Sequence, residues 1–145
     1  MYADLHLHTN YSDGTFTPEE LAEHCQRVGL KAMALTDHDT VDGCTRMAVA
    51  CSERDIEFVA GCEFTVEHDG NELHLLGYFL DLENDRLRGE LAKYQKVRRN
   101  RIHEMVVKLN ELGVKITSDD VMKIANCDAP GRPHIGRALM AMGHC

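Results

Sequence analysis

The first fourteen residues contain two histidines and a carboxylate whose spacing is typical of metal ligands. His6 and His8 alternate with Leu5 and Leu7, and Asp13 follows in a turn that contains glycine. Because successive side chains of a β-strand point to opposite faces, the two imidazoles share one face and the two leucines point toward a core. Imidazole and carboxylate groups together bind Zn, Mn or Fe. The spacing therefore predicts a metal site, with two surface histidines on an edge strand as the alternative.

Further imidazole and carboxylate groups follow the ends of predicted strands. His38 comes shortly after the apolar run 31–36, and Glu63 comes shortly after the run 56–60. His74 lies in a later predicted strand. Because sites gather at the carboxyl ends of parallel strands, these side chains are expected to converge. The candidate metal ligands are His6, His8, Asp13, His38, Glu63 and His74.

Six donors exceed the four that one tetrahedral site takes, so we expect two or three divalent ions (Mn, Zn or Fe) in the complete site. Two ions about 3.5–4 Å apart can hold a phosphate and lower the pKa of a shared water. Glu63 is the natural bridge, since one carboxylate can span two ions. Structural roles remain the alternatives: His74 as a sheet histidine, Asp13 as a turn former, and Asp37 or Asp39 at a helix start.

The elements that must position these groups alternate between strand and helix. Thr17 is expected to cap a helix with Pro18 in its first turn and Glu20 closing a capping box. The predicted order is strand 2–7, helix 17–29, strand 31–36, helix 43–54 and strand 56–60. This β-α-β-α-β order predicts a parallel sheet with right-handed crossovers.

The remainder of the chain changes character. Residues 64–79 are expected to form a hairpin that turns at His68–Asn71, and helices are expected over 85–112, from a Ser118 cap to 126, and over 131–143. We therefore divide the chain into a metal-binding α/β portion, residues 1–84, and a helical cap, residues 85–145. Residues 1–85 carry four Lys or Arg against eighteen Asp or Glu, whereas residues 86–145 carry twelve against six. The acidic part suits cations and the basic part suits an anionic substrate.

Composition excludes several classes of protein. The 145 residues are 43% hydrophobic and 28% charged, which is ordinary for one globular domain. No apolar run approaches the roughly 18 residues of a membrane helix, and Asp4 interrupts any signal peptide. We therefore expect a cytoplasmic protein without a membrane partner. Its six cysteines, none in a C-x-x-C pair, are expected to be reduced and mostly buried.

Five motifs carry a family resemblance. In chain order they are His6-x-His8, Tyr11-Ser12-Asp13-Gly14, Leu35-Thr36-Asp37-His38-Asp39, Gly61-Cys62-Glu63 and Leu73-His74-Leu75-Leu76-Gly77-Tyr78. Together they resemble the PHP (polymerase and histidinol phosphatase) superfamily. Residues 96–101 and 131–135 resemble the helical insertion of its stand-alone phosphoesterases. That subgroup includes nucleoside 3′,5′-bisphosphate phosphatases and 5′–3′ exoribonucleases.

The resemblance implies an α/β fold: the amino-terminal part of a distorted (β/α)7 barrel with a trinuclear site, followed by an all-helical insertion. By carry-over, His6, His8 and Glu63 bind one ion, Asp13 and His38 a second, and Glu63 with His74 a third. The implied substrate-phosphate contacts are Arg98, Arg101, Arg132 and His134, for which a solvated basic face is the alternative. Catalysis would use a metal-bound hydroxide and no further catalytic side chain.

The implied function is hydrolysis of phosphate esters of nucleotides or short oligonucleotides. The implied substrate is a nucleotide or another phosphorylated small molecule, or short RNA. The family pattern also has a His and an Asp-x-His after the insertion, which residues up to Cys145 do not supply. We therefore expect an incomplete barrel in this chain, with an exposed strand edge and self-association through it. The alternatives are a truncated or non-catalytic PHP metal-binding or interaction module, and a histidinol-phosphate-type phosphatase.

Overall fold

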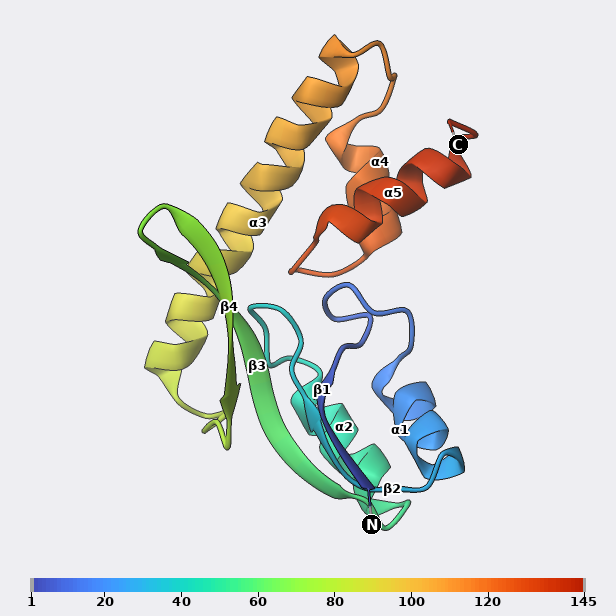
Figure 1. Cartoon of the computed structure of the whole chain (residues 1–145), viewed down its shortest axis with the longest axis vertical. Coiled ribbons are helices and arrows are strands. Elements are labelled where there is room, and N and C mark those ends of the chain that lie inside the picture. The colour runs from blue at the N-terminus through green and yellow to red at the C-terminus, as the bar shows by residue number, and fades with distance from the viewer. Residues whose placement is uncertain (1, 145) are drawn as a thin grey trace.

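The structure, a computed structural model, describes residues 2–144. Four strands and five helices follow one another much as predicted, except that the predicted strand 56–60 and the first hairpin strand form one strand (Figure 1). They are β1 (Tyr2–Leu7), α1 (Pro18–Arg27), β2 (Leu30–Leu35), α2 (Cys44–Ser52), β3 (Glu57–His68), β4 (Asn71–Tyr78), α3 (Asp85–Glu111), α4 (Ser118–Ala125) and α5 (Arg132–Ala141).

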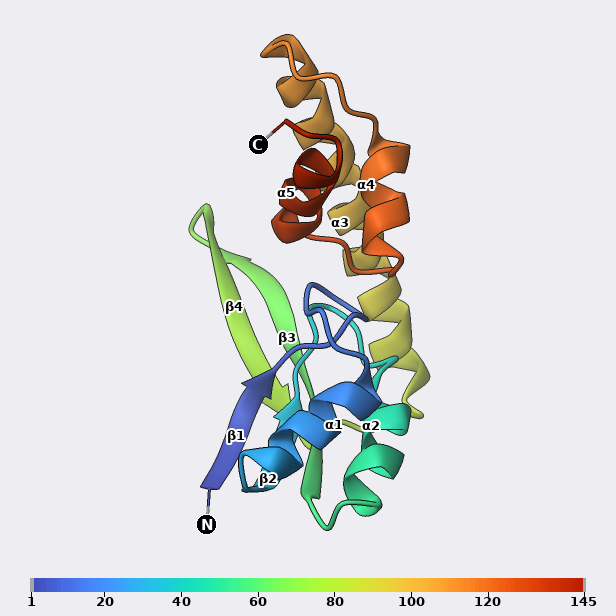
Figure 2. The ribbon, with the colours of Figure 1, turned by 90° about the vertical axis from the view of Figure 1, so that its right-hand side faces the viewer.

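The strands form one curled sheet in the order β1-β2-β3-β4. The pairs β1–β2 and β2–β3 are parallel, and β3–β4 is an antiparallel hairpin. Helices α1 and α2 lie on the same face of this sheet (Figure 2). Each helix connects two neighbouring parallel strands, as the β-α-β-α-β pattern predicts, and connections of the usual right-handed kind place both helices on one face. The result is the predicted amino-terminal part of an α/β barrel.

The first helix begins as its sequence predicts. Thr17 accepts a hydrogen bond from the backbone N–H of Glu20, and the Glu20 carboxylate accepts one from the backbone N–H of Thr17. Pro18 occupies the first turn, where its missing N–H costs nothing. One face of α1 then buries Leu21 and Cys25 against the sheet.

The main core lies between the sheet and these two helices. It contains Met33 and Leu35 of β2, Met47 of α2, and the thiols of Cys25, Cys44, Cys51 and Cys62, which are free and buried as predicted. Leu7 packs against this core, but Leu5 remains 45% exposed. The prediction that both leucines face a core is therefore wrong for Leu5. As an edge strand, β1 is covered along only part of its length.

The third strand is longer than the sequence pattern predicted. Instead of a strand ending at Ala60 and a separate hairpin strand, β3 runs unbroken through Glu63 to His68. Its first four residues pair with β2 and the remaining eight with β4. At the change of partner, a Cβ on Gly61 would lie 2.8 Å from the Gly77 carbonyl oxygen and 3.0 Å from that of Leu35. Glycine is therefore required where three strands meet.

The last three helices form a cap with its own apolar cluster, made by Ile102, Val106, Ile116, Val121, Ile135 and Ala138. Helix α3 also contributes Leu91 to the main core, so it contacts both apolar clusters. The prediction of Ser118 as the cap of α4 is wrong by one residue. Thr117 is the N-cap and forms a capping box with Asp120. Among the described residues, no helix combines the length and apolarity that crossing a membrane requires.

Candidate metal centre

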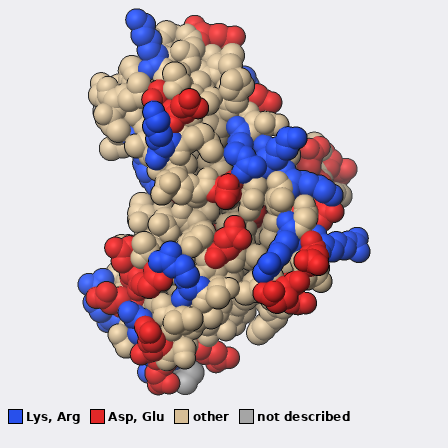
Figure 3. All heavy atoms as spheres, turned by 180° about the vertical axis from the view of Figure 1, so that it is seen from behind, with Lys and Arg blue, Asp and Glu red and all other residues tan. Residues whose placement is uncertain are grey.

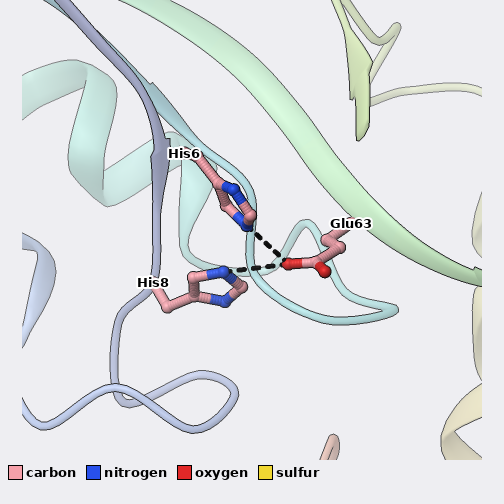
Figure 4. Close-up of side chains that lie close together, drawn as sticks. All are labelled: His6, His8 and Glu63. Carbon is pink, nitrogen blue, oxygen red and sulfur yellow. Dashed lines mark hydrogen bonds and ion pairs between the residues drawn. The ribbon is translucent and has the colours of Figure 1, made fainter. Parts of the chain in front are cut away.

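Glu63 joins two histidines of the first strand region. Its Oε2 atom lies 2.7 Å from Nε2 of His6 and 3.0 Å from Nε2 of His8 (Figure 4). Glu63 is buried, whereas the side chain of His6 is 50% exposed. The curl of the sheet brings β1 and β3 together here, although β2 lies between them in strand order.

Asp13 connects the same cluster to His38. One carboxylate oxygen of Asp13 lies 3.6 Å from Nδ1 of His8, and the other lies 3.6 Å from Nε2 of His38. These separations are too long for hydrogen bonds. They leave room for an ion to be held between the donors.

His74 approaches Glu63 from the hairpin. Its Nδ1 lies 2.6 Å from Oε1 of Glu63, while Nδ1 of His38 lies 3.7 Å from Oε2. The two oxygens of one carboxylate thus face different histidines, as a bridging ligand requires. The antiparallel pairing of β3 with β4 places His74 close to Glu63 in space.

The six predicted ligands fall into three groups that could each hold an ion. The groups are His6–His8–Glu63, His8–Asp13–His38 and His38–Glu63–His74, with the ligand atoms of each group within 4.8 Å of one another. Every group offers three side-chain donors. Three protein donors with a remaining open position are the pattern of catalytic zinc sites.

Two further observations fit a metal. Nδ1 of His38 is buried and has no hydrogen-bond partner among the described residues. Burial, followed by the charge of Arg98, lowers the pKa of His38 to about 4. Its imidazole is therefore neutral at pH 7, the form that binds metals. For Glu63, burial raises the pKa, but the hydrogen bond from His6 and the neighbouring histidines lower it overall, so the carboxylate is ionised.

The loop that carries Asp13 is fixed by Asp37, a residue that the sequence suggested for a helix start. The buried carboxylate of Asp37 accepts hydrogen bonds from the backbone N–H and hydroxyl of Thr9 and from the hydroxyl of Ser12. Burial raises the pKa of Asp37, and these hydrogen bonds partly offset the effect. A Cβ at Gly14 would lie 2.4 Å from the His8 carbonyl oxygen, so this loop closes only with glycine there.

Asp39 fastens the cap beside His38. Its carboxylate accepts hydrogen bonds from the backbone N–H and hydroxyl of Thr65 and from Nε of Arg98. Asp39 has a φ of 50°, in the left-handed region that Asp tolerates better than most residues. In the sequence, Asp37 and Asp39 stand out only because they flank the candidate ligand His38. Their hydrogen-bond partners cannot be predicted from the sequence alone.

A pocket of about 430 Å³ lies beside the candidate ligands Asp13, His38 and His74. Three of the four predicted phosphate contacts line it: Arg98, Arg101 and Arg132. Arg98 already uses Nε and Nη2 on Asp39 and Thr65. Seen from behind, Lys and Arg side chains gather at mid-height, where the cap meets the sheet (Figure 3).

The fourth predicted phosphate contact, His134, does not line this pocket. It is buried at the start of α5, where Nδ1 accepts a hydrogen bond from the backbone N–H of Gly131. Burial lowers its pKa. One turn later, Arg137 donates from Nη2 to the carbonyl oxygen of Asp13 at 2.6 Å. Arg137 was not among the residues predicted from the sequence. The only feature that could have suggested it is its position one helical turn after His134.

Comparison with known proteins places this arrangement in a family. The model of the PHP domain matches residues 4–138. The chain belongs to the PHP family. This PHP chain is 30% identical over 140 residues to a 5′-3′ exoribonuclease of Haemophilus influenzae, covering 97% of this chain and 51% of the relative. It is 32% identical over 143 residues to a 3′,5′-nucleoside bisphosphate phosphatase of Chromobacterium violaceum, covering 97% and 50%.

A solved structure from Bifidobacterium adolescentis, named as a candidate metal-dependent phosphoesterase, superposes on the PHP chain with a TM-score of 0.90. It is 33% identical, and the match covers 99% of this chain and 51% of that one. The resemblance of the motifs to the PHP family is thus confirmed, and so is the predicted fold. The chain spans about half the length of the curated relatives that it matches.

Proposed function

We propose that this PHP protein is a metal-dependent phosphoesterase that hydrolyses phosphate esters of nucleotides or short oligonucleotides. The observation that supports this most directly is the convergence of three potential ion sites around Glu63, beside a pocket lined by three arginines. We assign His6, His8, Asp13, His38, Glu63 and His74 as ligands of two or three divalent ions (Mn, Zn or Fe).

The side chains have distinct tasks in this reaction. A divalent ion at such a site polarises phosphoryl oxygens and supplies a nucleophilic water near neutral pH. Ionised Glu63 and neutral His38 hold the ion positions. Arg101 and Arg132 bind the phosphate oxygens through N–H groups in a fixed planar fork, which stabilises charge that develops on them. Arg98 presents Nη1, since its other nitrogens hold Asp39 and Thr65.

The substrate class rests on the relatives. Those named above are a bisphosphate phosphatase and an exoribonuclease, so we propose a nucleotide or short RNA as substrate. A cytoplasmic location fits such a substrate. His134 contacts phosphate, in this proposal, only if the start of α5 moves, because its side chain is buried in the structure.

The test uses the purified chain. Metal content per chain is counted by an element-resolved method, and phosphate release is followed from nucleoside 3′,5′-bisphosphate, nucleoside 5′-monophosphate, short RNA and histidinol phosphate. Bound ions with release from the nucleotide substrates support the proposal. Bound ions without release from any ester would instead indicate a metal-binding module without catalysis. Release from histidinol phosphate alone would assign the other phosphatase class.

We also propose that two copies of the chain associate through the open sheet. Strands β1 and β4 are its two edges, and the exposed apolar side chains there include Tyr2, Leu5, Leu73 and Leu75. Unpaired strand edges with apolar side chains are templates for pairing with another chain. Light scattering over a range of protein concentrations tests this, and a monomer at every concentration contradicts it.

A further inference from the structure

The pocket beside the metal centre has two chemically different ends along α3. Arg98, Arg101, Ile102 and Met105 line it from positions i, i+3, i+4 and i+7, which form one face of the helix. Arg98 is tied to Asp39 next to His38, so the first of these positions lies at the ligand cluster. Met105 is two turns further along the helix and lies at the other end of this face.

The end at Met105 is apolar. Ile102 and Met105 of α3 line it. Pro130 and Pro133 add apolar surface to the same pocket from the segment that leads into α5, on either side of Gly131, where a Cβ would lie 3.8 Å from Nη1 of Arg98. Ile102 and Pro130 are buried, while the side chain of Met105 is partly exposed. None of these four side chains carries a hydrogen-bonding group. A phosphate would have no partner among them, whereas an apolar surface would gain by leaving water.

The length of the pocket requires more than a phosphoryl group. Met105 lies seven positions after Arg98 on α3, which corresponds to a rise of about 10 Å along the helix axis. A phosphate bound at the arginines therefore leaves the far end to the alcohol part of the ester. Pockets of this kind combine a few polar groups that fix orientation with apolar walls that supply affinity.

We propose that Met105, with Ile102, Pro130 and Pro133, forms a subsite for the flat ring of the substrate's alcohol part, which is the base in a nucleotide. This subsite rests on the proposed phosphoesterase function and would determine which substrates that function prefers. A thioether is flexible and polarisable and makes favourable contacts with aromatic rings. Because the subsite offers no hydrogen-bonding side chain, it selects for ring area rather than for a particular base. Purine nucleotides therefore bind more tightly than pyrimidine nucleotides.

Equilibrium binding to the metal-free chain tests the subsite without requiring catalysis. The probes are inorganic phosphate, ribose 5-phosphate, CMP and AMP. We expect affinity to rise in that order, and Met105→Ala to weaken AMP binding on the order of fivefold while leaving ribose 5-phosphate binding unchanged. Met140→Ala is the matched control, because Met140 is 67% exposed on α5.

Met105 also packs against the apolar cluster of the cap, so a folding defect must be separated from a binding defect. Met105→Leu keeps apolar volume and is expected to keep the preference for AMP, and thermal unfolding is measured for each variant. Equal affinities for AMP and ribose 5-phosphate in the unaltered chain, including no detectable binding of either, overturn the subsite. If the chain binds AMP more tightly than ribose 5-phosphate but hydrolyses no ester, the subsite stands and only the proposed function is contradicted.

Discussion

Nε of Arg98 donates a hydrogen bond to Oδ2 of Asp39 at 2.5 Å, in a contact that joins the cap to the candidate metal centre. Asp39 has no exposed surface and immediately follows His38, and Arg98 also donates to the Thr65 hydroxyl at 2.7 Å. The cap helix α3 is therefore fixed beside a candidate metal ligand by a buried ion pair. Its guanidinium can line the pocket only in the orientation that this pair sets.

Asp39→Asn is expected to destabilise the protein by about 3–5 kcal/mol, since it leaves the Arg98 charge buried without a counter-ion. Asn tolerates the left-handed backbone at this position, so the loss reports the charge rather than strain. Urea unfolding measures it. Asp55→Asn is the control: Asp55 also has a positive φ but is solvent-exposed, and a change within about 0.5 kcal/mol is expected. Similar losses of unfolding free energy in both variants would show that the Arg98–Asp39 ion pair does not contribute specifically to stability.

Glu63→Gln is expected to lower metal affinity at least about tenfold, because Glu63 belongs to two of the three potential ion sites. Metal content after dialysis against a defined free-metal buffer measures this. Glu67→Gln, an exposed position on the same strand, removes the same charge and serves as the matched control. Retention of the full metal content by Glu63→Gln would remove Glu63 from the ligand set.

Arg101→Ala is expected to lower kcat/KM for a nucleotide substrate about tenfold, which corresponds to the loss of one charge-assisted hydrogen bond to the phosphate. The arginine lines the pocket and pairs with Glu72 at 2.5 Å, so both its position and its charge are defined. Lys96→Ala removes an exposed charge from the same helix as the control. If both variants lower kcat/KM equally, the effect is long-range attraction of the substrate rather than contact with it.

The pH dependence of stability should include a contribution from His134. Burial holds its folded-state pKa below the usual 6.5, so the unfolded chain binds the extra proton more readily. Its contribution is therefore complete above about pH 6.5 and is lost as the pH falls below that value. Unfolding free energies of the metal-free chain and of His134→Gln are compared from pH 7.5 to pH 5. The variant should show the shallower decline, and parallel curves would contradict the burial argument.

Gly61→Ala is expected to destabilise the protein by about 1–3 kcal/mol, because the new methyl group would meet backbone carbonyl oxygens of two neighbouring strands. Gly89→Ala makes the same change in α3, where the Cβ meets no atom within 4 Å. That control should gain about 0.5–1 kcal/mol from helix propensity. Thermal and urea unfolding measure both, and a neutral Gly61→Ala would show that the strand crossing can relax.

Local sequence patterns predicted most of the order of elements, the capping box of α1 and the six candidate ligands that the structure brings together around Glu63. These follow from period-two alternation, from capping chemistry and from residue type, which act over a few neighbouring residues. The convergence of His6 with Glu63 was expected from the parallel topology, but its geometry depends on the curl of the whole sheet. The unbroken course of β3 depends likewise on a contact between Gly61 and two other strands.

Tertiary structure alone decided what the charged residues of the cap contact. Arg98 and Arg101 look alike in sequence, yet Arg98 is tied to buried Asp39, 59 residues away, while Arg101 pairs with Glu72 at the pocket. His134 looks like a phosphate contact and is instead buried against the turn that begins α5. The physical reason is that the formation of an ion pair, or the burial of a side chain, depends on which distant segments of the chain pack together. No local pattern of residues encodes that information.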